Sequence, residues 1–227
     1  MQTLLTHLPL APSRCRCYTL RMLPYTIVRL EQRSAEWHRW RLDGIGASDA
    51  PTVMGENPYS SRAALLHEKL TGEGAPQSFY MSRGVSLEPV ARRQFERLVG
   101  LPFRPLCLQS TSTDWLRASL DGLSTDRSRV VEIKCGQAAY RTTVSTGQPP
   151  GHYYGQLQHI LAVTGLESID FVCYLPERPL LHLTVPRDEP YIAALLLAES
   201  LFWEQVLAER ARPTPRFRRQ SPGRRKP

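Results

Sequence analysis

Three charged residues, Asp121, Glu132 and Lys134, stand at a spacing that suits metal-assisted chemistry. Carboxylates are the hard oxygen ligands that Mg²⁺ prefers, and a lysine beside them supplies a positive charge or a proton acceptor. Hydrolysis of a phosphodiester needs a metal ion that polarises the phosphate and lowers the pKa of a water. A surface ion pair produces the same spacing, so the spacing alone leaves both interpretations open.

The strand expected over residues 130–135 places two of these residues on one face. Side chains alternate across a strand, so Glu132 and Lys134 project together while their apolar neighbours point into the core. Charged groups on an apolar strand cost stability unless they pair or bind an ion. We therefore expect a metal site here, with Asp121, Glu132 and the backbone carbonyl of Ile133 as oxygen donors.

The preceding strand is expected over residues 115–120, and it ends at a turn-like pair, Asp121-Gly122. If the two strands pair as a hairpin, Asp121 lies beside Glu132. A polar loop is expected after the second strand, and a helix is expected over residues 152–163. On that helix Gln156 borders an apolar stripe, so it would face the strands from the core side.

Helices are expected before and after these strands. Ser34 caps a short helix through Arg41, and Ser48 starts another. A last helix is expected from about residue 189 to Arg210. The sequence therefore predicts an α/β fold, a single domain with a central mixed β-sheet flanked by helices.

A long helix expected over residues 81–99 contains an acid in an unusual place. The apolar stripe advances in steps of three and four residues, and Glu88 falls on it. A carboxylate that faces the core needs a partner. Because Pro89 follows directly, we expect a kink or a fresh helix start at this point.

The two ends of the chain are basic, whereas the middle is slightly acidic. Residues 210–227 contain eight basic residues and no acid, and residues 1–30 contain four arginines and no acid. Residues 31–209 carry 17 basic and 21 acidic side chains. We expect an N-terminal arm over 1–30, disordered or an over-extended start, a folded domain over 31–209 and a basic tail over 210–227. The tail either contacts nucleic-acid phosphates or is only solvated.

Composition argues against several classes of protein. The longest apolar run, residues 192–198, is far shorter than the ~20 residues of a membrane helix. No secretory signal is evident. The odd number of cysteines indicates reduced thiols rather than a disulfide framework, and neither cysteines nor histidines pair at metal-ligand spacing. A cytoplasmic protein is therefore expected.

Several short blocks together resemble the YqaJ-like viral recombinase family, also known as the phage lambda exonuclease family. The blocks follow the family's order between Glu31 and Leu207: Glu36–Arg41, Gly44–Asp49, Arg83-Gly84 with Leu87–Arg92, Ser119–Gly122, Val131–Cys135 and Tyr153–Gln158. Each block is short, and their joint order and spacing make the resemblance specific. Leu120 stands where the wider restriction-endonuclease-like superfamily has a proline, a residue without a chemical role.

The resemblance implies a restriction-endonuclease-like core and an exonuclease that acts on linear double-stranded DNA. Such an enzyme digests one strand from its 5′ end and leaves a 3′ single strand. By the resemblance, Asp121 and Glu132 bind one or two Mg²⁺ ions, for which Mn²⁺ substitutes, and Lys134 is the catalytic lysine. Glu88 lies at the metal, directly or through a water, and Gln156 positions water or phosphate.

The resemblance also implies contacts to the 5′-terminal phosphate or to nearby DNA, which involve Arg41, Ser48, Ser119 and Tyr154. Each assignment has a plainer alternative, because Arg41 is otherwise a surface arginine, Ser48 a helix cap and Tyr154 a packing residue. In the same way Gln156 is otherwise an amide at the edge of the core. The implied partners are DNA ends, a single-strand annealing protein and two further copies in a ring-shaped homotrimer, in a phage or prophage of a bacterial host.

Three other functions are weighed against this one. A structure-specific or nicking endonuclease would use the same centre without needing a free 5′ end. A catalytically silent DNA-binding relative would keep the fold, but every expected catalytic group is retained. A small-molecule or protein-binding α/β domain would require the matching blocks to be coincidental.

Overall fold

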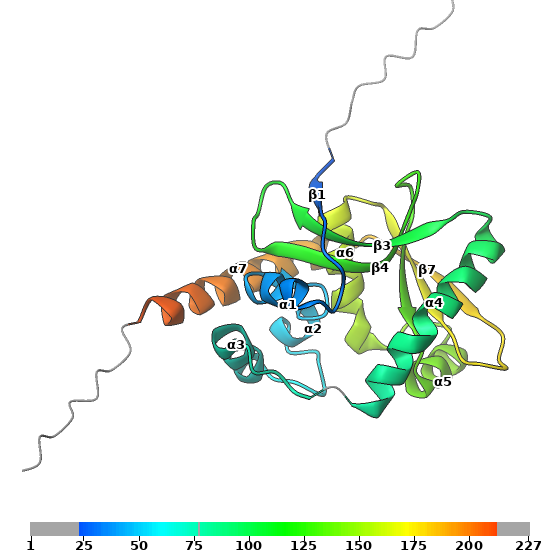
Figure 1. Cartoon of the computed structure of the whole chain (residues 1–227), viewed down its shortest axis with the longest axis horizontal. Coiled ribbons are helices and arrows are strands. Elements are labelled where there is room, and N and C mark those ends of the chain that lie inside the picture. Colours follow the sequence, from blue (N-terminus) through cyan, green and yellow to red (C-terminus); the bar gives the residue numbers. More distant parts are fainter. Residues whose placement is uncertain (1–22, 77, 213–227) are drawn as a thin grey trace, which may run out of the picture.

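The structure, a computed structural model, describes residues 23–76 and 78–212, and seven strands of this part form one mixed sheet (Figure 1). The strands are β1 Tyr25–Val28, β2 Ile45–Gly46, β3 Phe103–Ser110, β4 Leu116–Ser124, β5 Val130–Lys134, β6 Ser168–Cys173 and β7 Leu181–Pro186. Their order is β1-β3-β4-β5-β6-β7, with β2 paired to β4. The pairs β2–β4 and β5–β6 are parallel and the others antiparallel. The predicted fold class is confirmed.

Helices flank this sheet, and capping side chains fix where several of them begin. The helices are α1 Ala35–Leu42, α2 Ala50–Val53, α3 Arg62–Thr71, α4 Phe79–Val99, α5 Gln137–Thr146, the 3₁₀ turn η1 Gly151–Tyr153, α6 Tyr154–Thr164 and α7 Glu189–Ala211. The side chains of Ser34, Ser61 and Asp188 accept backbone hydrogen bonds at the starts of α1, α3 and α7. The predicted cap at Ser34 is thereby confirmed.

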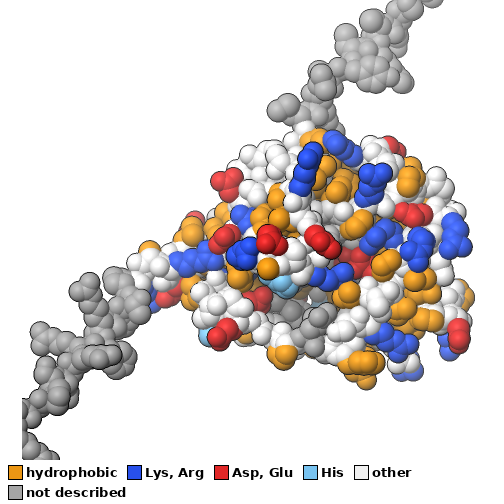
Figure 2. All heavy atoms as spheres, viewed as in Figure 1, with side chains coloured by type: hydrophobic (Ala, Val, Ile, Leu, Met, Phe, Trp, Pro, Cys, Tyr) orange, Lys and Arg blue, Asp and Glu red, His pale blue; other side chains and the backbone are white. Residues whose placement is uncertain are grey.

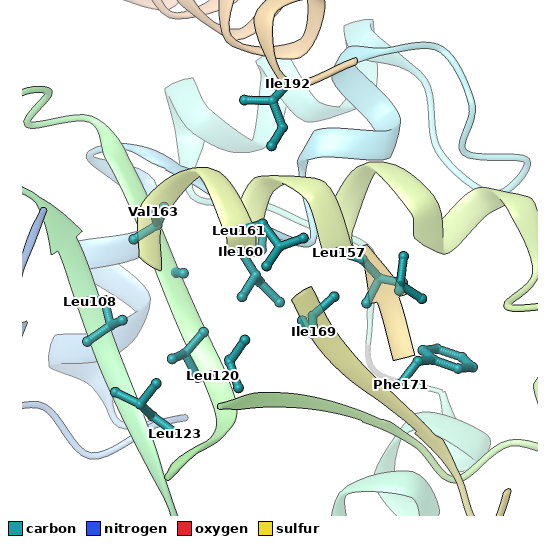
Figure 3. Packing of buried hydrophobic residues seen from close by; sticks show 14 of the residues in the cluster. Leu108, Leu120, Leu123, Leu157, Ile160, Leu161, Val163, Ile169, Phe171 and Ile192 are labelled. Carbon is teal, nitrogen blue, oxygen red and sulfur yellow. The ribbon is translucent and has the colours of Figure 1, made fainter. Parts of the chain in front are cut away.

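Helix α6 covers one face of the sheet, and apolar side chains fill the space between them (Figure 3). Leu157, Ile160 and Leu161 of α6 are fully buried in a cluster with Leu120 of β4 and Phe171 of β6. Full burial of each such side chain contributes about 1.5–3 kcal/mol. This packing fixes the position of α6 over β4 and β6.

Helix α4 covers the opposite face. Its Ala91 and Phe95 pack against Val131 and Ile133 of β5 and Val172 of β6. The residues of β5 that alternate with these, Glu132 and Lys134, therefore face the α6 side, as the predicted strand alternation requires.

Helix α7 is long and apolar enough to cross a membrane by length and composition alone. In this fold it buries Ile192, Leu195, Phe202 and Val206, and also the charged Glu199. A core helix passes the same length and composition test, so α7 is weak evidence for a membrane span.

Strand β4 changes its neighbour along one edge. Strand β3 pairs with one edge of β4, while on the other edge β2 pairs with Leu116 and Arg117 and β5 pairs with Gly122 and Leu123. Residues 118–121 lie between these two pairings, at the point where β2 and β5 separate. We call this point the fork of the sheet.

The predicted turn at Asp121-Gly122 is wrong, because β4 continues through both residues to Ser124. The chain reverses after Ser124, where the amide of Arg127 donates to the Ser124 carbonyl. Gly122 serves a different purpose from a turn. A Cβ at this position would lie 2.9 Å from both Phe103 Cβ and Val131 Cγ1, so only glycine lets the three strands approach this closely.

One further expectation about the elements differs from the structure: the predicted polar loop after Cys135 contains helix α5, which buries Ala139, Tyr140 and Thr143. At Pro89 the sequence predicts a kink or a fresh helix start, and the structure has no fresh start, because α4 runs through this residue. A kink at Pro89 stays a prediction.

The predicted boundary between arm and domain, at residues 30 and 31, also differs from the structure. The sheet begins earlier, at Tyr25, because β1 pairs with β3 along Tyr25–Val28. At the other end α7 stops at Ala211, close to the expected end of the domain at residue 209. Residues 1–22 and 213–227, with most of the predicted arm and tail, lie outside the described residues.

Candidate active site

Two carboxylates meet at the fork of the sheet, where Asp121 of β4 faces Glu132 of β5. The Asp121 carboxylate accepts a hydrogen bond from the Ile133 amide at 2.7 Å, and Glu132 is only 2% exposed. Burial, then the negative charges of Glu132 and Glu88, raise the pKa of Asp121 well above its ordinary value. A buried carboxylate beside a second acid is costly in its charged form, and a bound cation would offset that cost.

Lys134 and Gln156 share one oxygen of Glu132. The Lys134 ammonium donates to Glu132 Oε1 at 2.7 Å and to Gln156 Oε1 at 3.0 Å, and Gln156 Nε2 donates to the same Glu132 oxygen at 2.6 Å. Burial lowers the pKa of Lys134, but the Glu132 carboxylate, Tyr153 and Asp121 together raise it above its ordinary value. Lys134 is therefore held as a cation.

The other oxygen of Glu132 supports a metal at this position. Glu132 Oε2 is buried and has no hydrogen-bond partner in the described part of the chain. An unpaired buried carboxylate oxygen is costly unless an ion completes its shell. Residues 23–76 and 78–212 contain no group of three or more His, Cys, Asp and Glu side chains placed to hold a metal. A metal at the fork would therefore rest on two carboxylates, Asp121 and Glu132, and on the Ile133 carbonyl that the sequence predicts as a further donor.

Glu88 lies near this pair but is held by two arginines. One carboxylate oxygen contacts Arg33 at 2.9 Å and the other contacts Arg92, and the Glu88 side chain is 12% exposed. Its charge still reaches Asp121, whose pKa it helps to raise. The partner that the apolar stripe required is therefore a pair of arginines on the edge of the candidate metal site.

A pocket of about 150 Å³ is lined both by Asp121 and by the predicted phosphate residues. Its lining includes Asp121, Gln156, Arg41, Ser48 and Ser119. The structure thus brings together side chains from β4, α6, α1 and the start of α2. A larger hollow of about 400 Å³ at the C-terminal end of α4 holds none of them.

Arg41 is fixed in this pocket before any ligand arrives. Its guanidinium donates to Ser48 Oγ, lies 3.4 Å from an Asp49 oxygen and stacks 4.7 Å from the Trp37 ring centre. Lys69, 3% exposed, donates to Asp49 at 2.7 Å and to the Arg41 carbonyl at 2.9 Å. Although burial opposes its charge, Lys69 and Arg41 hold the pKa of Asp49 below its ordinary value.

The two remaining predicted DNA contacts have different surroundings. Ser119 lines the pocket, and its hydroxyl accepts a hydrogen bond from Trp37 Nε1 at 2.7 Å. Tyr154 is not part of this lining. Its hydroxyl donates to Asp188 at 2.8 Å, and burial followed by that bond raises the pKa of Tyr154 to about 12. Tyr154 therefore ties α6 to the start of α7.

Besides Lys69, sequence reasoning missed three residues that contact the predicted site residues. The Lys134 ammonium lies 4.5 Å from the ring centre of Tyr153, while Trp37 stacks on Arg41 and Arg33 contacts Glu88. Tyr153 and Trp37 stand inside the blocks used for the resemblance, so their positions were available. Arg33 lies outside every block, and only the folded chain shows its place.

Comparison with known proteins identifies the relatives of this chain. Residues 36–167 match the YqaJ-like viral recombinase domain. Over 189 residues the chain is 27% identical to the uncharacterized protein YqaJ of Bacillus subtilis strain 168, an alignment that covers 80% of this chain. The chain spans only 59% of the length of that relative.

Two solved structures share the fold. The alkaline exonuclease LHK-Exo of Laribacter hongkongensis is similar with a TM-score of 0.68 at 30% identity, over 78% of this chain and 94% of that one. A phage related exonuclease from Haemophilus somnus 129PT is similar with a TM-score of 0.53 at 14% identity, over 73% and 96% of the two chains. At that identity the second likeness concerns the fold alone.

Proposed function

Because this chain belongs to the YqaJ-like viral recombinase family, we propose that it is a metal-dependent exonuclease that digests linear double-stranded DNA from the 5′ end. One observation carries the proposal: the pocket that contains Asp121 and Gln156 also contains Arg41 and Ser48. The residues proposed to bind a phosphate and an acid proposed to bind a cation therefore line one cavity. The LHK-Exo relative has also been solved in complex with dAMP, a nucleotide.

The carboxylates Asp121 and Glu132, with the Ile133 carbonyl, are the residues proposed to hold Mg²⁺, with Mn²⁺ as a substitute. When bound, such an ion polarises the phosphate and lowers the pKa of a water. The raised pKa of Asp121 and the unpaired oxygen of Glu132 support this assignment. Glu88 is near enough to add charge or to hold a water.

Lys134 acts in this proposal as a cation rather than as a base, because its pKa is raised. Two of its three N–H donors have acceptors in Glu132 and Gln156, and the third remains for a phosphate oxygen or a water. Positive charge fixed at that place stabilises the negative charge that develops on the phosphate during cleavage. Gln156 keeps the ammonium in position through its amide oxygen.

Arg41 and Ser48 are the proposed receptor for the phosphate at the 5′ end. A guanidinium offers a planar fork of N–H donors that matches phosphate oxygens, and the Ser48 hydroxyl adds another donor. Ser119 borders the same pocket. Binding the terminal phosphate at one end of the pocket would set which phosphodiester lies against Asp121.

Binding of the rest of the duplex must depend on local patches of basic side chains, because residues 31–209 carry more acids than bases. Figure 2 shows arginine and lysine side chains gathered on the side of the molecule that carries β3 and α4. Such patches contact phosphates without reading sequence. The proposal also includes a single-strand annealing protein as the partner, a homotrimeric ring as the assembly and the cytoplasm of a bacterial host as the location.

The decisive assay compares linear duplexes with and without 5′ phosphates, nicked circles and closed circles, in Mg²⁺, in Mn²⁺ and in EDTA. We expect cleavage of linear DNA only, faster with a 5′ phosphate and absent in EDTA. Lys134→Ala should lose cleavage, while Arg178→Ala, an exposed cation between β6 and β7, should retain it. Cleavage of circles would favour the endonuclease, and DNA binding without cleavage would favour a silent relative.

A further inference from the structure

The backbone of Arg33 has a conformation that suits glycine rather than arginine. Residues 31–34 form a turn closed by a hydrogen bond from the Ser34 amide to the Glu31 carbonyl, and the third residue of this turn, Arg33, has a φ of 75°. Side chains other than glycine are strained in this region. Strain of this kind persists where the surrounding structure enforces it and often marks a functional position.

The side chain at this strained position reaches the active-site pocket. Arg33 lines the pocket together with Arg41, Ser48 and Asp121. Its guanidinium lies 2.9 Å from a Glu88 oxygen, and its side chain is 46% exposed. Arg33 is therefore a cation in the cavity that the proposed DNA end would enter, on the side near the carboxylates.

Arg33 can exchange its ion pair with Glu88 for another anion at little cost. Half-exposed ion pairs contribute little stability, and Glu88 has a second arginine, Arg92, whose side chain is only 13% exposed. If Arg33 leaves, Glu88 keeps a partner. A phosphate offers Arg33 stronger, charge-assisted hydrogen bonds than the carboxylate it shares.

We propose that Arg33 is a DNA-contacting residue that exchanges Glu88 for a backbone phosphate of the strand seated in the pocket. The inference rests on the proposed nuclease function and assigns it a second phosphate contact, separate from the receptor formed by Arg41 and Ser48. Its place near Glu88 puts this contact on the metal side of the pocket. Arg33 thereby helps to hold the strand against Asp121 and Glu132.

The test exploits a matched control elsewhere in the chain. Arg127 is an exposed arginine with a φ of 61° in the turn after β4. Arg33→Gly and Arg127→Gly therefore relieve the same kind of backbone strain, but only the first removes a cation from the pocket. Binding of a 5′-phosphorylated linear duplex is measured in EDTA over a range of salt concentrations, and cleavage is measured in Mg²⁺.

We expect Arg33→Gly to weaken DNA binding about tenfold, the effect of losing one charge-assisted contact. The slope of log K against log salt concentration should fall by about 0.9, the value for one phosphate contact on duplex DNA. Its thermal unfolding midpoint should be no more than about 2 °C below that of the wild type. Arg127→Gly should change neither affinity nor slope.

Two further variants separate charge from shape. Arg33→Lys keeps the charge and should restore the salt slope, whereas Arg33→Gln should match Arg33→Gly. Equal slopes for Arg33→Gly and Arg127→Gly would overturn the inference, as would a failure of Arg33→Lys to restore the slope. Wild-type cleavage is scored separately. If the wild type cleaves DNA but Arg33→Gly and Arg127→Gly have equal slopes, this inference fails and the proposed nuclease function stands. If the wild type does not cleave DNA but Arg33→Gly alone has the lower slope, the nuclease function fails and the DNA contact of Arg33 stands.

Discussion

Two buried glutamates of this fold have the same hydrogen-bonding defect in different surroundings. In the described part of the chain, Glu132 and Glu199 each have one carboxylate oxygen that is bonded and one that is buried without a partner. Glu132 lies at the fork of the sheet beside a second acid, Asp121. Glu199 lies in α7, where its bonded oxygen is 2.7 Å from His159 Nδ1.

The surroundings decide what each unpaired oxygen means. Asp121, the acid beside Glu132, lines a pocket and has a raised pKa, so a cation that enters the pocket can balance the two carboxylates. The Glu199 side chain is closed in the core against His159, whose other ring nitrogen is 2.8 Å from the Arg117 carbonyl. Both ring nitrogens of His159 face acceptors, so the pair shares a proton. An orphaned carboxylate oxygen therefore marks chemistry only where a cation has room to enter.

The largest expected effect comes from Glu132→Gln. Loss of one metal-binding charge should lower DNA cleavage by about 10³-fold, in the range of removing a group that stabilises the transition state. Without metal the same variant should lose less thermal stability than Glu199→Ala does, because relief of the repulsion of Asp121 offsets the lost ion pair with Lys134. Cleavage rate and thermal unfolding in EDTA measure the two effects.

Glu177→Gln, at an exposed acid between β6 and β7, is the matched control and should change neither value. If Glu132→Gln retains wild-type cleavage, the distinction drawn between the two glutamates is wrong.

The next effect in size comes from Glu199→Ala, which should lower stability and leave cleavage nearly unchanged. Removing one partner of a buried pair should lower the free energy of unfolding by about 3 kcal/mol, because His159 is left without its acid. Cleavage per folded molecule should stay within severalfold of the wild type. Urea unfolding and cleavage assays below the transition measure both. A folded Glu199→Ala protein that has lost its cleavage would show that this pair also belongs to the active site.

The smallest effect is a pH dependence of stability that His159 produces. Burial lowers the pKa of His159, but Glu199 and the Arg117 carbonyl raise it above its ordinary value of 6.5, as does the charge of Asp49. A raised pKa contributes stability that is fully present below 6.5 and is lost as the pH rises through the folded-state value. The advantage in unfolding free energy of the wild type over His159→Gln should therefore shrink from neutral pH upward.

This prediction is checked by urea unfolding of both proteins between about pH 6 and about pH 9, the range around an ordinary histidine pKa. An advantage that does not change with pH would mean that His159 is neutral throughout and that Glu199 carries the proton.

Local pattern was enough to predict the parts of the fold that local chemistry determines. Ser34 caps α1 because a hydroxyl satisfies backbone amides at any helix start. The alternation along β5 placed Glu132 and Lys134 on one face of the sheet, and Gln156 of α6 forms hydrogen bonds with both of them on that face. These assignments depend on neighbours within a few residues or on one strand pairing.

The failures involve contacts between distant residues. Gly122 looks like a turn glycine, but its requirement comes from Phe103 and Val131 on the two neighbouring strands. Lys69 anchors the phosphate pocket through Asp49 across 20 residues of chain, and Arg33 meets Glu88 across 55. The spacing of apolar residues along the sequence does not predict such pairs. The strand β2 has only two residues, too few for a pattern.

The fixed guanidinium of Arg41 has a consequence for how firmly the proposed site would hold a DNA end. A free arginine side chain has about 2 kcal/mol of rotamer entropy, and most of it is normally lost when the side chain binds a ligand. Here Ser48, Asp49 and the Trp37 ring already restrict Arg41, so that loss occurs when the chain folds. Binding of a terminal phosphate would then cost little further side-chain entropy at Arg41. A small contact area would therefore be enough for high affinity.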